Sequence, residues 1–291
     1  MTQTYGQVAA LPSIPIGPEA FSTSGDTALW WLTHAGFLVN SRGCLLMLDP
    51  AISYSPETPL PHERAISPRF LARSRMMVRL PVEAHQVPRL DAVLYTHADR
   101  DHLSIRSARE LFWTGATFFG PPPVTRELAK QGFPPERLRA VRSGETFRVG
   151  VVEVTPTPAD HPWQLQDPAK FGPPWGPGDC VGYLLRTPDG TVWCVGYTRL
   201  MVEHLRMTGV DLMLLDVARD PYHMGVGDSA RLANAMAGSR IIACHYGCYN
   251  TPDHVGWNGD PAEVAAKVTG ADRRFHVVAP GERIVLRRLT A

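Results

Sequence analysis

The order of the apolar segments is the feature that most constrains the fold. Three short apolar runs separated by turn residues open the chain and indicate a β-meander, and alternating strands and helices follow it. The same order recurs in the second half, where the turn Thr-Pro-Asp-Gly at 187–190 joins another pair of strands. Two sheets packed face to face with helices outside accommodate two such halves. We therefore predict an α/β fold, a four-layer αββα sandwich.

The hydrophobic periodicities give definite ranges for these elements. The predicted strands span residues 28–33, 37–40, 44–49, 91–96, 116–120, 145–155 with an interruption at Gly150, 181–186, 191–196, 210–216, 241–244, 275–278 and 283–289. The predicted helices span residues 104–112, 124–131, 202–207, 228–237 and 261–268. We expect residues 1–27 to form an N-terminal extension and residues 28–291 a single domain with a Pro/Arg-rich insertion at about 51–88.

The charge balance and the cysteines bear on partners and location. With 29 basic and 28 acidic residues the formal net charge is +1, so no global field favours nucleic acid or an anionic membrane. No window approaches the roughly 20 apolar residues of a membrane span, and no export signal is apparent. The five cysteines are scattered without a C-x-x-C pair, which is typical of reduced thiols. We expect a cytoplasmic protein with a small-molecule substrate, no nucleic-acid partner and no stable membrane insertion; a homo-oligomer is compatible with the sequence.

Four candidate metal ligands lie within six residues on the loop between the predicted strand 91–96 and helix 104–112. They are His97, Asp99, Asp101 and His102. Imidazole and carboxylate together suit Zn²⁺, Fe or Mn²⁺, and this spacing allows one or two ions. In the competing interpretation the polar residues form turns and a helix cap, with Asp101 or Ser104 as the cap, but this explains the density less well. We predict one or two divalent metal ions, Zn, Mn or Fe.

Six short segments match, in order, those of a known superfamily. They are Trp-Leu-Thr-His-Ala-Gly-Phe at 31–37, Leu-Asp-Pro at 48–50, Thr-His-Ala-Asp-Arg-Asp-His at 96–102, Asp-His at 160–161, Val-Gly-Tyr-Thr at 195–198 and Cys-His-Tyr-Gly at 244–247. From about residue 28 to its end the chain resembles the metallo-β-lactamase superfamily. The resemblance is strongest to the branch of ascorbate-6-phosphate lactonase-like and N-acylphosphatidylethanolamine phospholipase-like hydrolases.

The resemblance implies two metal sites. Carried over residue by residue, the first comprises His97, Asp99 and His161, and the second comprises Asp101, His102 and His245. The chain departs from the family at two of its positions, because Asp99 replaces a histidine and Tyr197 replaces the aspartate that bridges the two ions. Tyr197 could bind as a phenolate or be no ligand at all. Asp216, at the end of a predicted strand, could replace the bridge or support a ligand histidine.

Metal-activated water is the chemistry that such a centre supplies. We predict a hydrolase acting on a small-molecule ester, lactone, amide or phosphoester, with Asp101 also orienting or deprotonating the water. The carboxylate at position 99 leaves a second hypothesis, an Fe- or Mn-dependent oxidoreductase of the same fold that uses O₂, because two histidines and one carboxylate also hold mononuclear Fe(II). A degenerate binding protein without turnover is the third hypothesis.

Several other side chains are candidates for catalysis or substrate binding. His223, at a predicted strand-to-helix connection, titrates in the range suited to general acid catalysis, and Tyr197 is the other catalytic candidate. His34 lies in a Thr-His-Ala-Gly turn and could contact substrate or only pack the turn. Arg199 could hold a substrate carboxylate or phosphate, although surface arginines are common. A Gly/Pro-rich loop carries two aromatic residues that could line a pocket or fix the loop to the core, Trp163 and Trp175.

Overall fold

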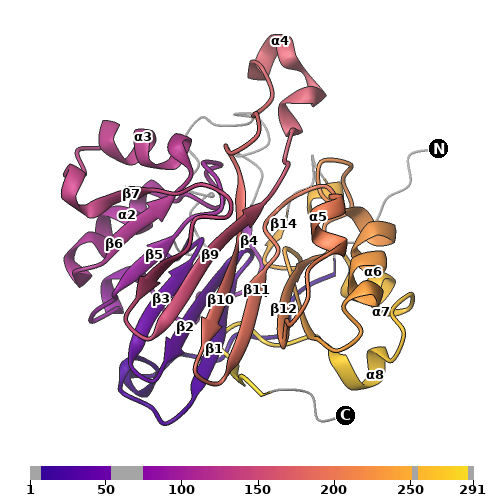
Figure 1. Ribbon diagram of the computed structural model, residues 1–291, viewed down its shortest axis with the longest axis horizontal. Helices are drawn as coiled ribbons and strands as arrows, with labels where there is room; N and C mark the ends of the chain where they lie inside the picture. The colour runs from indigo at the N-terminus through magenta and orange to yellow at the C-terminus, as the bar shows by residue number, and fades with distance from the viewer. Residues whose placement is uncertain (1–7, 54–74, 251–254, 288–291) are drawn as a thin grey trace.

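The structure is a computed structural model that describes residues 8–53, 75–250 and 255–287, with two seven-stranded sheets at its centre (Figure 1). The first sheet has the order β16 (Arg283–Val285), β1 (Thr27–Thr33), β2 (Gly36–Ser41), β3 (Cys44–Leu48), β5 (Ala92–Leu94), β6 (Thr117–Gly120), β7 (Leu138–Ala140). The second has the order β15 (Phe275–His276), β13 (Arg240–Cys244), β12 (Leu212–Asp216), β11 (Gly190–Cys194), β10 (Val181–Thr187), β9 (Val152–Pro158), β8 (Phe147–Val149). A separate short pair joins β14 (Tyr249–Asn250) to β4 (Arg75–Met76).

Helices flank the two sheets on their outer sides, except α4, which projects beyond the ends of the strands (Figure 1). The α-helices are α2 (Ile105–Leu111), α3 (Pro122–Lys130), α4 (Pro168–Phe171), α5 (Val202–Leu205), α6 (Gly225–Ala235), α7 (Pro261–Ala265) and α8 (Ala271–Arg274). Short 3₁₀ helices are η1 (Pro18–Phe21), η2 (Ala84–Gln86), η3 (Phe112–Thr114), η4 (Pro135–Arg137), η5 (Trp163–Gln166) and η6 (Val255–Trp257).

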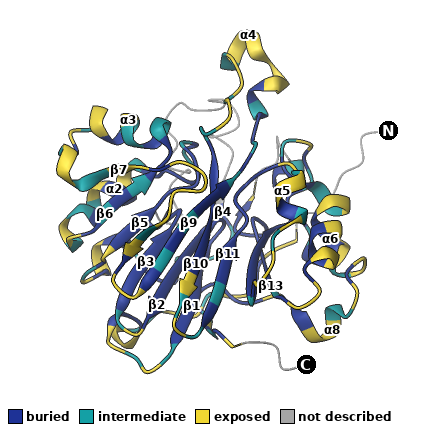
Figure 2. Cartoon of the chain, in the orientation of Figure 1, coloured by how far each residue is buried: buried dark blue, intermediate teal, exposed yellow. Residues whose placement is uncertain are grey.

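Strands buried on both faces explain the layered arrangement. In β3, Leu46 and Leu48 belong to the core shared with the second sheet, whereas Leu45 and Met47 belong to a core beneath α2 and α3. Alternate side chains of a strand point to opposite faces, so a continuous apolar run fills both cores at once. Figure 2 shows the strands buried and the outer faces of the helices exposed. The predicted four-layer αββα sandwich is confirmed.

Most predicted elements are present, and the differences concern short segments. Helix α6 begins at Gly225, three residues before the predicted start, and the predicted strand at 275–278 ends at His276. The elements β7, α4, α8 and the β14–β4 pair were not predicted, because two to four residues are too few to show a period. Residues 54–74 of the predicted insertion and the last residues of the predicted strand 283–289 lie outside the described residues.

The described part of the N-terminal extension lies along the domain. Ala10 N donates to Gly247 O at 3.0 Å and Ile14 N donates to Pro280 O at 2.8 Å. The division into an extension and a single domain at residue 28 stays a prediction. All five cysteines are free and buried, as expected for reduced thiols. None of the helices in the described ranges has the length and apolar character needed to cross a membrane.

The carboxyl ends of strands from both sheets meet at one edge of the sandwich. Strands β3 and β5 are parallel in the first sheet, and β11, β12 and β13 are parallel in the second. Two backbone hydrogen bonds join the sheets at this edge: Val181 N donates to Thr96 O at 2.9 Å, and His245 N donates to His34 O at 3.0 Å. Loops at carboxyl ends of parallel strands are common ligand sites. The topology therefore brings polar residues from distant parts of the chain together here.

Candidate metal centre

The first of two His/Asp clusters consists of His97, Asp99 and His161, as predicted. Nε2 of His97 lies 3.4 Å from Oδ2 of Asp99, and Nε2 of His161 lies 3.5 Å from the same oxygen. His161 Nδ1 donates to Tyr222 O at 3.0 Å, so this ring keeps the Nε2 lone pair free. His97 Nδ1 lies 2.9 Å from Thr96 Oγ1, whose proton goes to Asp49, so Nδ1 carries the proton of this ring too. Both rings therefore present a free lone pair at Nε2.

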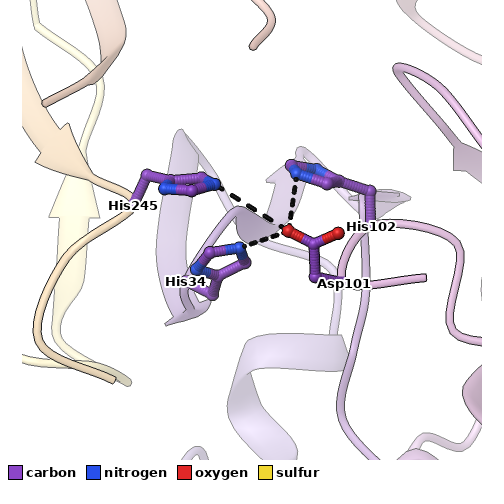
Figure 3. A group of neighbouring side chains, drawn as sticks. All are labelled: His34, Asp101, His102 and His245. Carbon is purple, nitrogen blue, oxygen red and sulfur yellow. Dashed lines mark hydrogen bonds and ion pairs between the residues drawn. The ribbon is translucent and has the colours of Figure 1, made fainter. Parts of the chain in front are cut away.

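The second cluster centres on Oδ2 of Asp101. Three imidazole Nε2 atoms converge on this oxygen, from His34 at 3.1 Å, His102 at 3.3 Å and His245 at 3.9 Å (Figure 3). Two of these rings are also fixed by a hydrogen bond at Nδ1, on the side away from Asp101. His102 Nδ1 donates to Asp49 at 3.0 Å, and His245 Nδ1 donates to Trp257 O at 3.0 Å. The predicted ligands Asp101, His102 and His245 are thus together, and His34 joins them.

The spacing of the ligand atoms fits a divalent metal. An ion with ligands at about 2.0–2.1 Å in tetrahedral geometry sets neighbouring ligand atoms roughly 3.3 Å apart. The distances above, 3.1–3.9 Å, bracket this value. In addition, Nε2 of His97 and Nε2 of His245 are buried without a hydrogen-bond partner. A buried unpaired polar atom costs about 1–3 kcal/mol, which coordination of a cation would offset. The residues of both clusters therefore fit a metal.

Asp49 organises one ligand from each cluster, and the sequence analysis assigned it no role. Its carboxylate accepts from the Thr96 backbone N at 2.7 Å, from the Thr96 hydroxyl and from His102 Nδ1. Through the Thr96 hydroxyl it also fixes the ring of His97. Carboxylates behind ligand histidines set the tautomer and the ring orientation. The available signal was its place directly after β3, next to the strand that carries the ligand loop.

Burial controls the protonation of the ligands. Burial lowers the pKa of His34 and His245, and it lowers that of His97 to about 4, so these imidazoles are neutral at pH 7. Burial also opposes charge on His102, but Asp101 and then Asp49 outweigh it and raise the pKa of His102 to about 10. Neutral imidazole is the form that binds metal. A cation at the second cluster would therefore compete with the proton on His102.

The backbone around the centre is strained. Among the described residues, five non-glycine residues have positive φ, and four of them are Thr33, His34, Asp49 and His245, with φ of 141°, 47°, 37° and 62°. Such conformations cost of order 1–3 kcal/mol each and persist where surrounding contacts determine them. Trp31 Nε1 and the His245 backbone N both donate to the His34 carbonyl at 3.0 Å. The strained turn is therefore held in place by the opposite sheet as well as its own strand.

His223 lies between the last histidines of the two clusters. Its ring centroid is 4.7 Å from that of His161 and 4.6 Å from that of His245. Nδ1 of His223 lies 2.5 Å from Oδ2 of Asp216, and Asp216 does not bridge the two clusters. Burial opposes its protonation, but Asp216 and Asp220 raise the pKa of His223 to about 9. Asp216 thus holds His223, which is not one of the predicted ligands, and its support of a ligand histidine stays a prediction.

Tyr197 lies beside both clusters, but its hydroxyl is engaged elsewhere. The ring centroid is 4.2 Å from that of His102, whereas the hydroxyl donates to the Ala35 carbonyl at 3.0 Å. Burial raises the pKa of Tyr197 well above its usual range, which disfavours the phenolate. The placement therefore supports the alternative in which Tyr197 is no ligand.

Replacing Tyr197 by phenylalanine is expected to leave the metal content and the turnover rate unchanged. Since the Ala35 carbonyl loses its donor, the free energy of unfolding should fall by about 1 kcal/mol. Elemental analysis, steady-state kinetics and urea unfolding measure the three quantities. A Tyr197→Phe variant that lost an ion would establish a phenolate ligand instead.

The four predicted substrate-binding residues take different positions. His34 is 1% exposed and contacts Asp101, so it belongs to the second cluster. Trp175 is half-buried, with its ring centroid 5.3 Å from that of His97. Arg199 forms an ion pair with Asp160 and lines, with His223, a pocket of about 610 Å³. Trp163 packs on Phe171 within the loop at a centroid distance of 5.0 Å.

Comparison with known proteins places this centre in a family. A protein of Pyrobaculum calidifontis named metal-dependent hydrolase is 28% identical over 88% of this chain and 98% of its own length. A probable L-ascorbate-6-phosphate lactonase of Escherichia coli is 23% identical over 82% of this chain and 73% of its own. The crystal structure of an isothiocyanate hydrolase from Delia radicum gut bacteria superposes with a TM-score of 0.68 at 19% identity, covering 88% of this chain and 98% of that one.

The family model described as the beta-lactamase superfamily domain matches residues 48–246. This range begins at the last residue of β3 and contains Asp49, the ligand loop after β5 and the histidine after β13, so it spans most of both clusters. The resemblance noted from the six sequence segments is thereby confirmed. Since the match covers well over half of the chain, the protein belongs to the beta-lactamase superfamily.

Proposed function

We propose that this protein is a metal-dependent hydrolase that cleaves a small-molecule ester, lactone, amide or phosphoester. The observation that carries the proposal is the pair of adjacent His/Asp clusters whose Nε2 atoms face Asp99 and Asp101 at ligand spacing. A divalent ion held there lowers the pKa of water toward 7 and polarises the bond to be cleaved. Relatives named metal-dependent hydrolase and probable lactonase support this reaction class.

The pocket beside His223 is the proposed route of the substrate to the metal centre. Its lining includes Arg199, Asp160 and Met224, and His223 connects it to the ring of His161. A pocket of about 610 Å³ has the size of a small-molecule site. Arg199 would lie within reach of an anionic substrate group, and Trp175 would cover the His97 side. The predicted additional role of Asp101 in orienting water stays a prediction.

We assign His223 the transfer of a proton to the leaving group. Asp216 holds Nδ1, so Nε2 is the nitrogen left for the substrate, as in other carboxylate–histidine pairs. A His223→Gln variant should lose roughly 100-fold or more in kcat, because general acid catalysis typically contributes 10²–10⁴-fold. Its metal content should stay that of the unaltered protein. Loss of an ion would instead make His223 a ligand.

The reaction class is tested by metal analysis combined with a substrate panel. Elemental analysis of the purified full chain gives the bound metal, and p-nitrophenyl acetate, a γ-lactone, a p-nitroanilide and bis(p-nitrophenyl) phosphate represent the four bond types. We expect metal-dependent cleavage of at least one class, with the same rate in air and under argon. Metal-replete protein that cleaves none of them would contradict the proposal.

A second function, an Fe- or Mn-dependent oxidoreductase, is favoured by one specific observation. The first cluster has two histidines and one carboxylate, the composition of mononuclear Fe(II) oxygenase sites, at spacings of 3.4 and 3.5 Å. Anaerobic purification followed by elemental analysis and measurement of O₂ consumption distinguishes the two functions. Full occupancy by redox-inert Zn²⁺ with O₂-independent turnover would eliminate the oxidoreductase.

A further inference from the structure

The two clusters differ in the number of ligand atoms they bring together. The first has three, from His97, Asp99 and His161. The second has four, because Nε2 of His34 joins the carboxylate and the two histidines, and all four atoms lie within 4.8 Å of one another (Figure 3). Structural zinc sites use four protein ligands in a closed tetrahedron, whereas catalytic sites use three and keep one position open. The ligand count therefore separates the clusters by role.

The position of His34 suits a ligand better than a substrate contact. Its ring packs against Trp257, at a centroid distance of 4.4 Å, and against His245, at 3.9 Å. The backbone at φ 47° is fixed by the two donors to its carbonyl and by the contact of its N–H with Cys248 Sγ at 3.1 Å. A side chain that is 1% exposed and packed against two rings has little room to adapt to a substrate, whereas its Nε2 already lies 3.1 Å from Asp101, at the spacing of two ligands of one ion.

Exposure also distinguishes the clusters. In the second cluster the histidine side chains are 0–1% exposed and Asp101 is 6% exposed. In the first cluster His97 is 1%, His161 5% and Asp99 10% exposed, and His161 adjoins the pocket through His223. Water and substrate therefore reach the first cluster more readily than the second.

With Tyr197 at its position, the chain lacks the bridging carboxylate that would connect the two ions. The resemblance places a bridging aspartate at this position, and here a phenol donates to the Ala35 carbonyl instead. Within the described residues, none of the four groups able to hold a metal contains both Asp99 and Asp101. Each cluster therefore has its own carboxylate, and the two ions can differ in affinity and in exchange rate.

We propose that the second cluster is a closed four-ligand site with His34 as its fourth ligand. The first cluster is then the open site, where substrate meets the protein. The assignment of substrate to the first cluster rests on the proposed hydrolase function. The proposal of a closed site does not rest on that function, because metal binding tests it without any substrate.

The test is metal stoichiometry and exchange in the full chain reconstituted with Zn²⁺. We expect two ions per chain, one removed quickly by EDTA and one removed at least roughly 10-fold more slowly, since a closed site lacks a position for the chelator. His34→Ala should lose the slow phase, because its second cluster keeps three ligands, as the first has, and should release its ion at the fast rate. His34→Gln, which still donates a hydrogen bond to Asp101, should lose it too. His85→Ala, at a histidine side chain that is 63% exposed, should behave like the unaltered protein.

Retention of the slow ion in His34→Gln would overturn the proposal, because hydrogen bonding alone would then explain His34. Uptake of a single ion by the unaltered protein would overturn it as well. If both His34 variants fail to fold, as judged by near-UV circular dichroism, the absorption spectrum of Co²⁺ in the unaltered protein decides. An intense tetrahedral spectrum for the slow ion supports the closed site, and a weak spectrum of higher coordination refutes it. If the stoichiometry is as expected but no substrate is cleaved, the hydrolase function fails and the closed site stands.

Discussion

Replacing His97 by alanine is expected to reduce hydrolysis by more than roughly 100-fold while leaving one ion bound. Loss of a group that only supports a metal ligand already costs 10–100-fold in affinity or activity, so loss of a ligand should cost more. The first cluster would keep only Asp99 and His161, whereas the second would keep all four of its ligand atoms. Elemental analysis after dialysis, together with the rate on whichever substrate class is cleaved, measures both effects.

The matched control for this experiment is again His85→Ala, which removes an imidazole from the surface. It should change neither the rate nor the metal content. If His97→Ala released both ions, the two clusters would be thermodynamically coupled, and the separation inferred from Tyr197 and His34 would be wrong. If it kept full activity, the first cluster would not be the catalytic one.

The candidate ligands could be named from the sequence because several of them follow apolar runs and because the family resemblance assigned the later histidines. His97 to His102 follow one apolar run and His245 follows another, and the topology places the carboxyl ends of both strands at the same edge. The layered fold therefore explains why these residues lie close together. Which atom of each ring is free could not be predicted, because it depends on carbonyls such as those of Tyr222 and Trp257.

Two residues show where the sequence was insufficient. The sequence predicts that His34 contacts substrate or packs the turn, not that it joins the metal ligands, because its contact with Asp101 requires a left-handed backbone and a partner 67 residues away. Asp49 ends a strand before a proline, a pattern that many turns share, and its function emerges only from the adjacent strand β5. Both cases depend on tertiary contacts, and the hydrophobic periodicity of a short segment carries no information about such contacts. The fold, by contrast, depends mainly on which strand residues are apolar. These residues can be identified directly from the sequence.

Replacing Asp49 by alanine is expected to weaken zinc at both clusters. The carboxylate orients His102 directly and His97 through Thr96, so one substitution releases a ligand ring from each site. A loss of 10–100-fold in affinity at each cluster is typical for such a group, and 100-fold corresponds to about 2.7 kcal/mol of stabilisation at saturating metal. The gap in melting temperature between zinc-loaded and metal-free protein should therefore shrink.

Asp91→Ala is the matched control, because Asp91 caps the opposite end of the same strands by accepting from Leu45 N at 2.7 Å. It should lower stability without affecting zinc. Titration calorimetry on the metal-free variants separates the two clusters: Asp49→Ala should weaken both binding steps, and His97→Ala only one. Since Asp49 contributes no atom to either predicted ligand set, equal losses in both steps would show that this single buried carboxylate preorganises the whole centre. If Asp49→Ala left zinc binding at the first cluster unchanged, Asp49 would influence only His102 and the closed site.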